Sequence, residues 1–283
     1  MILVTGAAGK TGQAILRRLS ANGVAAKAFV RNKQQANEAE AAGASSIAIG
    51  NLELAPDILA ALRGTDAVYF IPPNVHPRED EIGKTAIVAA LKAGVERFVY
   101  HSVLFPQVEA MPHHLRKLRV EEALIQSTLD FTILQPANYM QNVLSYRHYI
   151  ETEKIWKLPY TPEARSTPVD LQDIAEVAVR VLTDQSHSRA GYPLAGPDVL
   201  STTEMATRIS RFLGQDIRVQ RQDPNAWELL ALEIGLDETR IETLKLMFAY
   251  YNQHDFLGNS QVLEMLLGRP PTTFEQFLER NWI

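Results

Sequence analysis

Short apolar runs alternate with segments of helical periodicity through the first half of the chain. The apolar runs lack the period-two alternation of half-exposed strands, which is typical of strands buried on both faces of a sheet; they are Ile2–Thr5, Ala25–Val30, Ser46–Ile49, Ala67–Phe70, Arg97–His101 and Phe131–Leu134. The segments between them favour helices; they are Lys10–Ala21, Gln34–Ala42, Ala55–Leu62, Asp80–Ala93 and Pro112–Ser127. Because strands that alternate with helices form a parallel sheet with right-handed crossovers, the pattern predicts an α/β, doubly wound parallel-sheet Rossmann fold.

After Pro136 the pattern loosens, and the remaining chain is predicted to be mainly helical with a few short strands. Residues 160–168 are expected to be irregular. Two patterns of the capping-box type, Ser201-Thr-Thr-Glu204 and Thr272-Thr-Phe-Glu275, are predicted to open helices. Other helices are expected at Leu171–Thr183, Pro224–Leu232 and Asp237–Tyr251.

The composition narrows the classes of partner. The 283 residues are 46% hydrophobic and 22% charged, which is ordinary for a soluble globular protein. A net charge of −5 gives no electrostatic reason to expect nucleic acid or an anionic membrane surface as a partner. The chain has no cysteine, which excludes disulfides and thiolate chemistry and is consistent with a cytoplasmic location. We expect no membrane span, no signal peptide and no metal.

A glycine triplet follows the first predicted strand and opens the first predicted helix. In Gly6-Ala-Ala-Gly9-Lys-Thr-Gly12 the glycines are spaced three apart. Without a Cβ the backbone can turn sharply and approach a pyrophosphate, and the N–H groups of the new helix favour its negative charge. This context predicts a dinucleotide site, the alternative being an ordinary Gly-rich turn. The expected contacts are Thr5, Gly6, Ala8, Gly9, Lys10, Thr11 and Gly12.

The end of the second strand indicates which dinucleotide is bound. NAD sites place an acidic residue there, but this chain has Arg31 and no acid until Glu38. A guanidinium can bind a 2′-phosphate through two parallel hydrogen bonds, and Lys10 adds positive charge, so NADP(H) is the predicted cofactor. The alternative is that both are solvated surface charges. Further expected cofactor contacts are Asn51 at the adenine and Ile71 and Pro72 near the nicotinamide ribose.

Several motifs along the chain resemble those of a known family. The glycine loop with Arg31 resembles the atypical short-chain dehydrogenases/reductases, specifically their NmrA-like branch. The likeness continues through Tyr100-His-Ser102-Val, His113-His-Leu-Arg-Lys117-Leu-Arg-Val-Glu121, Phe131-Thr-Ile-Leu-Gln-Pro136-Ala-Asn138-Tyr-Met-Gln-Asn142, Pro168-Val-Asp170-Leu-Gln-Asp173, Tyr192-Pro-Leu-Ala-Gly196-Pro and Leu267-Gly-Arg-Pro270-Pro. The resemblance implies NADP(H) binding, with either reduction of quinones, dyes or activated double bonds, or a non-catalytic role as a redox sensor that binds regulators.

The resemblance also implies candidate catalytic residues. Typical short-chain reductases use Tyr-xxx-Lys with a nearby Ser, and the Tyr protonates the developing alkoxide. This chain has no Tyr-xxx-Lys; His113-xxx-Lys117 stands at the matching helix. Lys117 is expected to hold the nicotinamide ribose, with Glu121 orienting it through an i,i+4 pair. His113 is a general acid, a substrate-binding residue or a helix cap, and Ser102 either bonds a substrate carbonyl or ends a strand.

The remaining candidates follow the sixth strand. Pro136 and Asn138 are expected at the cofactor, and Tyr139, Met140, Asn142 and Trp156 at the substrate. We accordingly predict an NADP(H)-binding domain over residues 1–155, to which 165–190 return, and a smaller, mainly helical substrate-binding region over 156–283.

Three functions remain open at this point. The first is an NADPH-dependent oxidoreductase that transfers hydride to a quinone or another conjugated, aromatic small molecule. Quinone reduction suits the missing Tyr, because the hydroquinone oxygens can be protonated by His, Ser or water. The second is a non-catalytic NADP(H) sensor with a protein partner, and the third is a tailoring enzyme of aromatic secondary metabolites.

Overall fold

The computed structural model describes residues 1–282, which form two compact units. The first unit comprises residues 1–107, 113–135 and 171–192. The second comprises 108–112, 136–170 and the chain from Pro193 onward. The predicted assignment of cofactor and substrate regions, with its boundary at residue 155, stays a prediction.

A seven-stranded sheet organises the first unit. Its strands lie in the order β3-β2-β1-β4-β5-β6-β9. In chain order they are β1 (Ile2–Val4), β2 (Ala26–Val30), β3 (Ser46–Ile49), β4 (Ala67–Phe70), β5 (Arg97–His101), β6 (Asp130–Pro136) and β9 (Ala190–Leu194). The helices are α1 (Lys10–Ala21), α2 (Lys33–Ala41), α3 (Ala55–Leu62), α4 (Glu79–Ala93), α5 (Pro112–Gln126) and α7 (Leu171–Thr183), with a 3-10 turn η2 (Gln185–His187). The predicted doubly wound α/β fold is confirmed.

The strand order reverses beside β1, and this reversal locates the ligand edge of the sheet. In β1, Ile2 pairs in parallel with Ala26 of β2 on one side and with Ala67 of β4 on the other. The chain therefore winds outward in one direction through β2 and β3, and in the other from β4. In open α/β sheets, ligands bind beyond the carboxyl ends of the strands at such a switch point. The glycine turn after β1 lies there.

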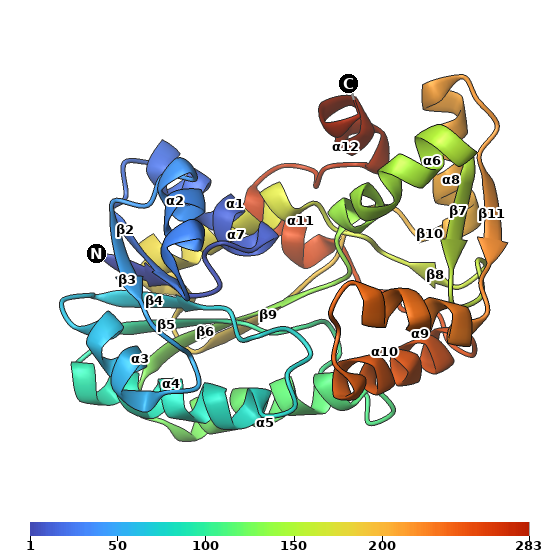
Figure 1. The fold of residues 1–283 in the computed structure, drawn as a ribbon. Coiled ribbons are helices and arrows are strands. Elements are labelled where there is room, and N and C mark those ends of the chain that lie inside the picture. The colour runs from blue at the N-terminus through green and yellow to red at the C-terminus, as the bar shows by residue number, and fades with distance from the viewer. Residues whose placement is uncertain (283) are drawn as a thin grey trace. The chain divides into compact units, whose positions relative to one another are not determined.

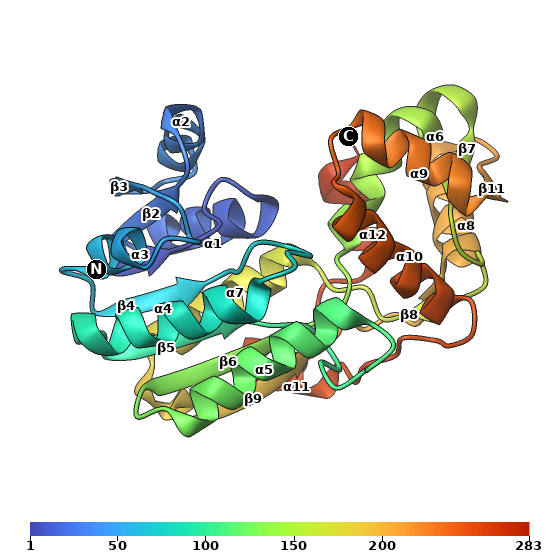
Figure 2. The ribbon, with the colours of Figure 1, turned by 60° about the horizontal axis from the view of Figure 1, so that its bottom comes forward.

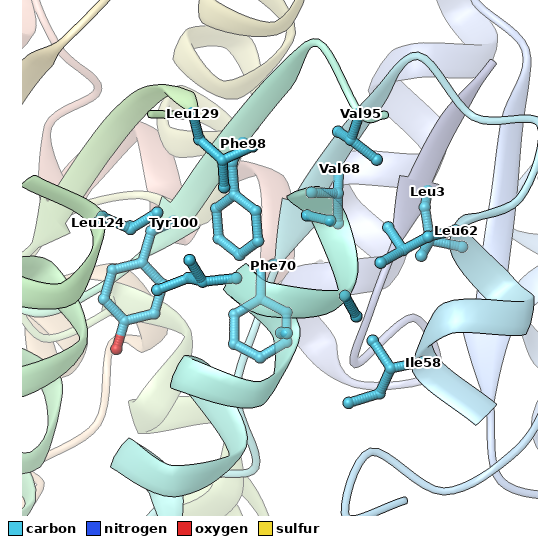
Figure 3. Close-up of a cluster of buried hydrophobic side chains, with 14 of the residues drawn as sticks. Leu3, Ile58, Leu62, Val68, Phe70, Val95, Phe98, Tyr100, Leu124 and Leu129 are labelled. Carbon is cyan, nitrogen blue, oxygen red and sulfur yellow. The ribbon is translucent and has the colours of Figure 1, made fainter. Parts of the chain in front are cut away.

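Helices cover both faces of this sheet (Figure 1). Figure 2 shows α4 and α5 running along one face, and α1 packs against α7 on the other. Between the sheet and α3, α4 and α5 lies a cluster of buried apolar side chains (Figure 3). At its centre the Phe70 ring packs 5.5 Å from the Phe98 ring and 6.2 Å from that of Tyr100, measured between centroids. Burial of this aromatic surface fixes the helices that carry the candidate site.

The second unit is mainly helical with two small sheets. β7 (Ile155–Leu158) pairs with β11 (Arg218–Arg221), and β8 (Arg165–Ser166) with β10 (Leu200–Ser201). The helices are α6 (Arg147–Glu153), α8 (Thr202–Leu213), α9 (Pro224–Glu233), α10 (Glu238–Tyr251), α11 (Gln261–Leu267) and α12 (Phe274–Asn281), with a 3-10 segment η1 (Met140–Tyr146). Its core includes Phe274 and Phe277 of α12, packed with Ile209 of α8.

The second predicted capping box is displaced by one residue. The second capping box is formed by Thr273 and Gln276, whereas we predicted Thr272 and Glu275. Both registers fit the sequence pattern, since Thr stands at each start and Glu or Gln three residues later. The register beginning at Phe274 buries Phe274, Phe277 and Leu278 on one face, so core packing selects it. The first capping box, at Ser201 and Glu204, is confirmed.

Candidate active site

The glycine turn has the backbone geometry of an anion site. Gly6 has a φ of +59°, a conformation that favours glycine. A Cβ on Gly12 would lie 2.3 Å from the Gly6 carbonyl oxygen, so the turn packs against the helix more closely than any side chain allows. Gly9 is the N-cap of α1 and has no side chain to cap the helix. The turn thus combines the close backbone packing and the bare N-cap that are typical of an anion-binding helix N-terminus.

Two basic residues stand where a dinucleotide would need positive charge. Lys10 is the first residue of α1, Arg31 follows the carboxyl end of β2, and both are exposed. The side chain of Asn32 caps α2 by accepting from the Gln35 N–H at 2.9 Å. A glycine cradle flanked by cations fits the pyrophosphate and extra phosphate of NADP(H). The individual cofactor contacts stay predictions.

Other expected cofactor residues surround the switch point. The Thr5 hydroxyl donates to the Ile71 carbonyl at 2.9 Å and accepts from the Ile71 N–H at 2.7 Å, which ties the end of β1 to the segment after β4. Pro72 is buried. Asn51 is exposed after β3, and its side-chain oxygen accepts from the Glu53 N–H at 3.0 Å.

Lys117 is paired with a residue that the sequence analysis did not single out. Its Nζ lies 2.5 Å from Oε1 of Glu79, the first residue of α4, and Glu79 is completely buried. The predicted i,i+4 pair between Lys117 and Glu121 is wrong. The Glu121 carboxylate instead accepts from Ser102 and, at 3.0 Å on each oxygen, from Gln135.

Ser102 therefore belongs to a buried hydrogen-bond network. It follows β5, Glu121 lies on α5 and Gln135 on β6, so the network joins three elements of the first unit. Burial raises the pKa of Glu121, and the hydrogen bonds from Ser102 and Gln135 oppose that rise. A substrate carbonyl would have to compete with Glu121 for the Ser102 proton.

The histidines near Lys117 are neutral at physiological pH. Burial, reinforced by neighbouring positive charge, lowers the pKa of His113 to about 3. Burial likewise brings His101 to a pKa of about 3 and His114 to a pKa of about 4. His101 Nδ1 and the Tyr69 hydroxyl are 2.7 Å apart, and His113 Nδ1 is buried without a partner. An imidazolium acid at His113 is disfavoured by these surroundings.

The remaining predicted residues lie in the second unit. Met140 and Trp156 are core side chains, 1% and 6% exposed. Tyr139 is half-buried, with its backbone bridged to Val169, and Asn142 is exposed. Pro136 ends β6, and the Asn138 side chain donates to the Ser166 hydroxyl at 3.2 Å. Their contacts with substrate or cofactor stay predictions.

Metal-binding clusters, membrane-spanning helices and cavities are the other features that could indicate a site. Within residues 1–282, no group of three or more His, Asp or Glu side chains could hold a metal ion. Over the same residues no helix is both long and apolar enough to cross a membrane. A cavity of about 370 Å³ is lined by Asp66, Arg97 and Asp130 among others. It lies at the amino ends of β4, β5 and β6, opposite the edge where ligands bind in this fold.

Comparison with known proteins decides the family. The profile of the NmrA-like family matches residues 1–278. The chain belongs to the NmrA-like family. This NmrA-like chain is 30% identical over 282 residues to an NAD(P)H azoreductase from Xenophilus azovorans, covering 99% of this chain and 98% of that protein.

Solved structures share the fold over nearly the full length. The NADPH-dependent quinone oxidoreductase of Escherichia coli, complexed with NADPH, superposes on this NmrA-like chain with a TM-score of 0.85 at 21% identity, covering 100% of both chains. The triphenylmethane reductase of Citrobacter sp., complexed with NADP(H), gives a TM-score of 0.84 at 20% identity, covering 99% of both.

Proposed function

We propose that this chain is an NADPH-dependent oxidoreductase that transfers hydride to a quinone or another conjugated, aromatic small molecule. The observation that carries the proposal is the combination, in one unit, of an uncapped glycine turn at the switch point with a buried lysine ammonium on the helix after β5. The relatives support it, since they are named as an NAD(P)H azoreductase, a quinone oxidoreductase and a triphenylmethane reductase.

Different residues of the chain are assigned to different parts of NADPH. NADPH, when bound, supplies the hydride. The turn from Gly6 to Gly12 receives the pyrophosphate, and Arg31 with Lys10 neutralises the 2′-phosphate. Lys117 gives one N–H to Glu79 and has two more with which to hold the nicotinamide ribose.

The acceptor is inferred from the proton donors. A carbonyl reduced to an alkoxide needs a strong, well-placed acid, but His113 is neutral and Ser102 donates to Glu121. A quinone becomes a phenol-type oxygen, whose pKa is about 10, so water or a hydroxyl can protonate it. Conjugated acceptors of this kind fit the site better than simple ketones.

The proposal is tested with purified protein, NADPH and a panel of quinones, azo dyes and simple ketones. We expect loss of nicotinamide absorbance with the conjugated acceptors and none with the ketones. Tight NADPH binding with no turnover of any acceptor would overturn the reductase proposal and favour a non-catalytic NADP(H) sensor.

Cofactor preference is expected to depend on Arg31. Arg31→Asp removes a charge-assisted contact and adds repulsion, so it should raise the Kd for NADPH about tenfold or more while changing that for NADH little. The measurement is a titration with each dinucleotide. Arg63→Asp, the same charge change at an exposed site after α3, is the matched control. Equal effects of Arg31→Asp on both cofactors would show that Arg31 does not bind the 2′-phosphate.

The pH profile of kcat should carry no titration of His113. Because burial holds the pKa of His113 at about 3 against an ordinary 6.5, its charge does not change near neutral pH. His113→Asn is therefore expected to leave the pH dependence of kcat unchanged, like His148→Asn at an exposed position. A wild-type rate that falls along a histidine curve, and loses that curve only in His113→Asn, would make His113 the acid.

A further inference from the structure

Burying the Glu79–Lys117 ion pair carries a desolvation penalty, which suggests that the pair has a role other than stabilising the fold. Glu79 has 0% exposure, and its second oxygen, Oε2, is buried without a partner. Burial raises the pKa of Glu79, and the neighbouring Lys117 lowers it. A buried ion pair is often no more stabilising than apolar residues of the same volume. The burial of this ion pair therefore does not by itself indicate that it stabilises the fold.

Close packing of two helices brings the pair together. Gly83 stands one turn after Glu79 on α4, and Val120 lies three residues after Lys117 on α5. A Cβ on Gly83 would lie 2.5 Å from Val120 Cγ2, so only glycine allows this approach. On the outer side of the same seam, Arg119 Nη1 lies 3.6 Å from Asp80 Oδ2. The register of α4 against α5 thus sets the place of the Lys117 ammonium.

The carboxylate nearest in sequence is already engaged. Glu121 lies one helical turn from Lys117, but it accepts hydrogen bonds from Ser102 and Gln135. Lys117 consequently has its ion-pair partner on α4, 38 residues away along the chain.

We propose that Glu79 is the positioning residue for Lys117, holding its ammonium charged and fixed on the α4 side so that the remaining N–H groups meet the cofactor. The inference rests on the proposed function, because it assigns Lys117 to the nicotinamide ribose. Glu79 itself touches neither cofactor nor substrate in this assignment. It acts by keeping the charge and the direction of the Lys117 side chain.

Charged and titratable groups from several elements surround the Glu79–Lys117 pair. The charged and titratable groups that interact with the pair come from β5, α5 and the segment before α4: Tyr100, His101, His113, His114, Arg116, Glu121 and His76. His101, His113 and His114 are neutral at physiological pH, and burial raises the pKa of Tyr100 well above its ordinary value. These four groups therefore keep their charge across the working range of pH.

The test uses Glu79→Gln, which keeps the shape and removes the charge. The matched control is Asp80→Asn, the next carboxylate along α4, which pairs with Arg119 and Lys84 at the surface. The readout is the pH profile of the NADPH Kd without acceptor, measured from about pH 6 to about pH 9, with Lys117→Met as the reference for a lost ammonium. Buried lysines without a counter-charge can titrate several pH units low.

In wild type and Asp80→Asn, the NADPH Kd is expected to stay flat over this pH range. In Glu79→Gln the NADPH Kd should become pH-dependent and rise about tenfold toward high pH, because a buried ammonium without a counter-charge loses its proton more easily. Glu79→Asp, which restores the charge, should recover part of the affinity and serves if Glu79→Gln does not fold. An NADPH Kd in Glu79→Gln that is unchanged and flat with pH would overturn the inference. Failure of wild type to bind NADPH would instead overturn the proposed function.

Discussion

Replacing Lys117 with methionine is expected to lower kcat/KM for quinone reduction about 100-fold or more, the range seen when a preorganised electrostatic contact is removed from an active site. Methionine keeps the apolar stem of lysine and removes the ammonium. Stopped-flow or steady-state decay of NADPH absorbance with a quinone measures the effect. Lys84→Met, at an exposed position on α4, is the control. Full activity in Lys117→Met would remove Lys117 from the mechanism.

The same variant should also lose stability, and the two losses can be separated. Without Lys117, Glu79 is left buried and unpaired, which costs about 3–5 kcal/mol if it stays charged. The pKa of Glu79 in the folded state then rises further above its ordinary 4.5, so folded protein keeps a proton that unfolded chain releases. The free energy of unfolding of Lys117→Met should therefore fall as pH rises above that value.

A double variant distinguishes a fold defect from a chemical one. Glu79→Gln combined with Lys117→Met leaves no buried charge at the pair. Its unfolding free energy, measured in urea, should recover and lose the pH slope. Quinone reduction should remain as low as in Lys117→Met alone. Recovery of activity together with stability would mean that Lys117 acts only through the fold.

The glycine turn was predictable because the residues that determine its conformation are close together in the sequence. The three glycines, the strand before them and the helix after them lie within twelve residues, and the structure places them as expected, with Gly6 at positive φ and Gly9 as the N-cap. The alternation of strands and helices likewise predicted the sheet, since each element carries its own periodicity.

Glu79 was missed because its role is tertiary. The helix was predicted to begin at Asp80, one residue late, and Glu79, Asp80 and Glu81 form an acidic first turn of the ordinary kind that complements a helix dipole. Nothing local distinguishes the one carboxylate that is buried. The helical spacing instead pointed to Glu121, which the fold uses for Ser102 and Gln135. Gly83, at a buried helix position, was the available signal of a close approach.

The second unit was harder to predict for a different reason. Its strands are two to four residues long and pair across large separations, as in Arg218 with Ile155. Such short strands carry no periodicity. Trp156 and Met140 lie in the hydrophobic core of this unit, and their predicted contacts with a substrate stay predictions. An aromatic or sulfur side chain has the same sequence signal in either place.

The second large effect is expected from a substitution in the glycine turn. Gly12→Ala is expected to abolish saturable NADPH binding, or to raise its Kd about 100-fold, and to destabilise the chain by about 1–3 kcal/mol. The added Cβ would lie 2.3 Å from the Gly6 carbonyl oxygen and 2.6 Å from the Ala7 Cα. Both atoms are backbone, so the turn that receives the pyrophosphate must move. Calorimetric titration with NADPH and urea unfolding measure the two effects.

Gly191→Ala is the matched control for this substitution. It adds the same methyl group where no atom lies within 4 Å and where φ is not positive. NADPH affinity and the free energy of unfolding should match wild type. Wild-type affinity in folded Gly12→Ala would contradict the assignment of this turn to the pyrophosphate, since a displaced turn could not present the α1 N-terminus to it. Because Gly12 is buried and its added Cβ would meet backbone atoms of Gly6 and Ala7, lost binding in folded Gly12→Ala would reflect a displaced turn.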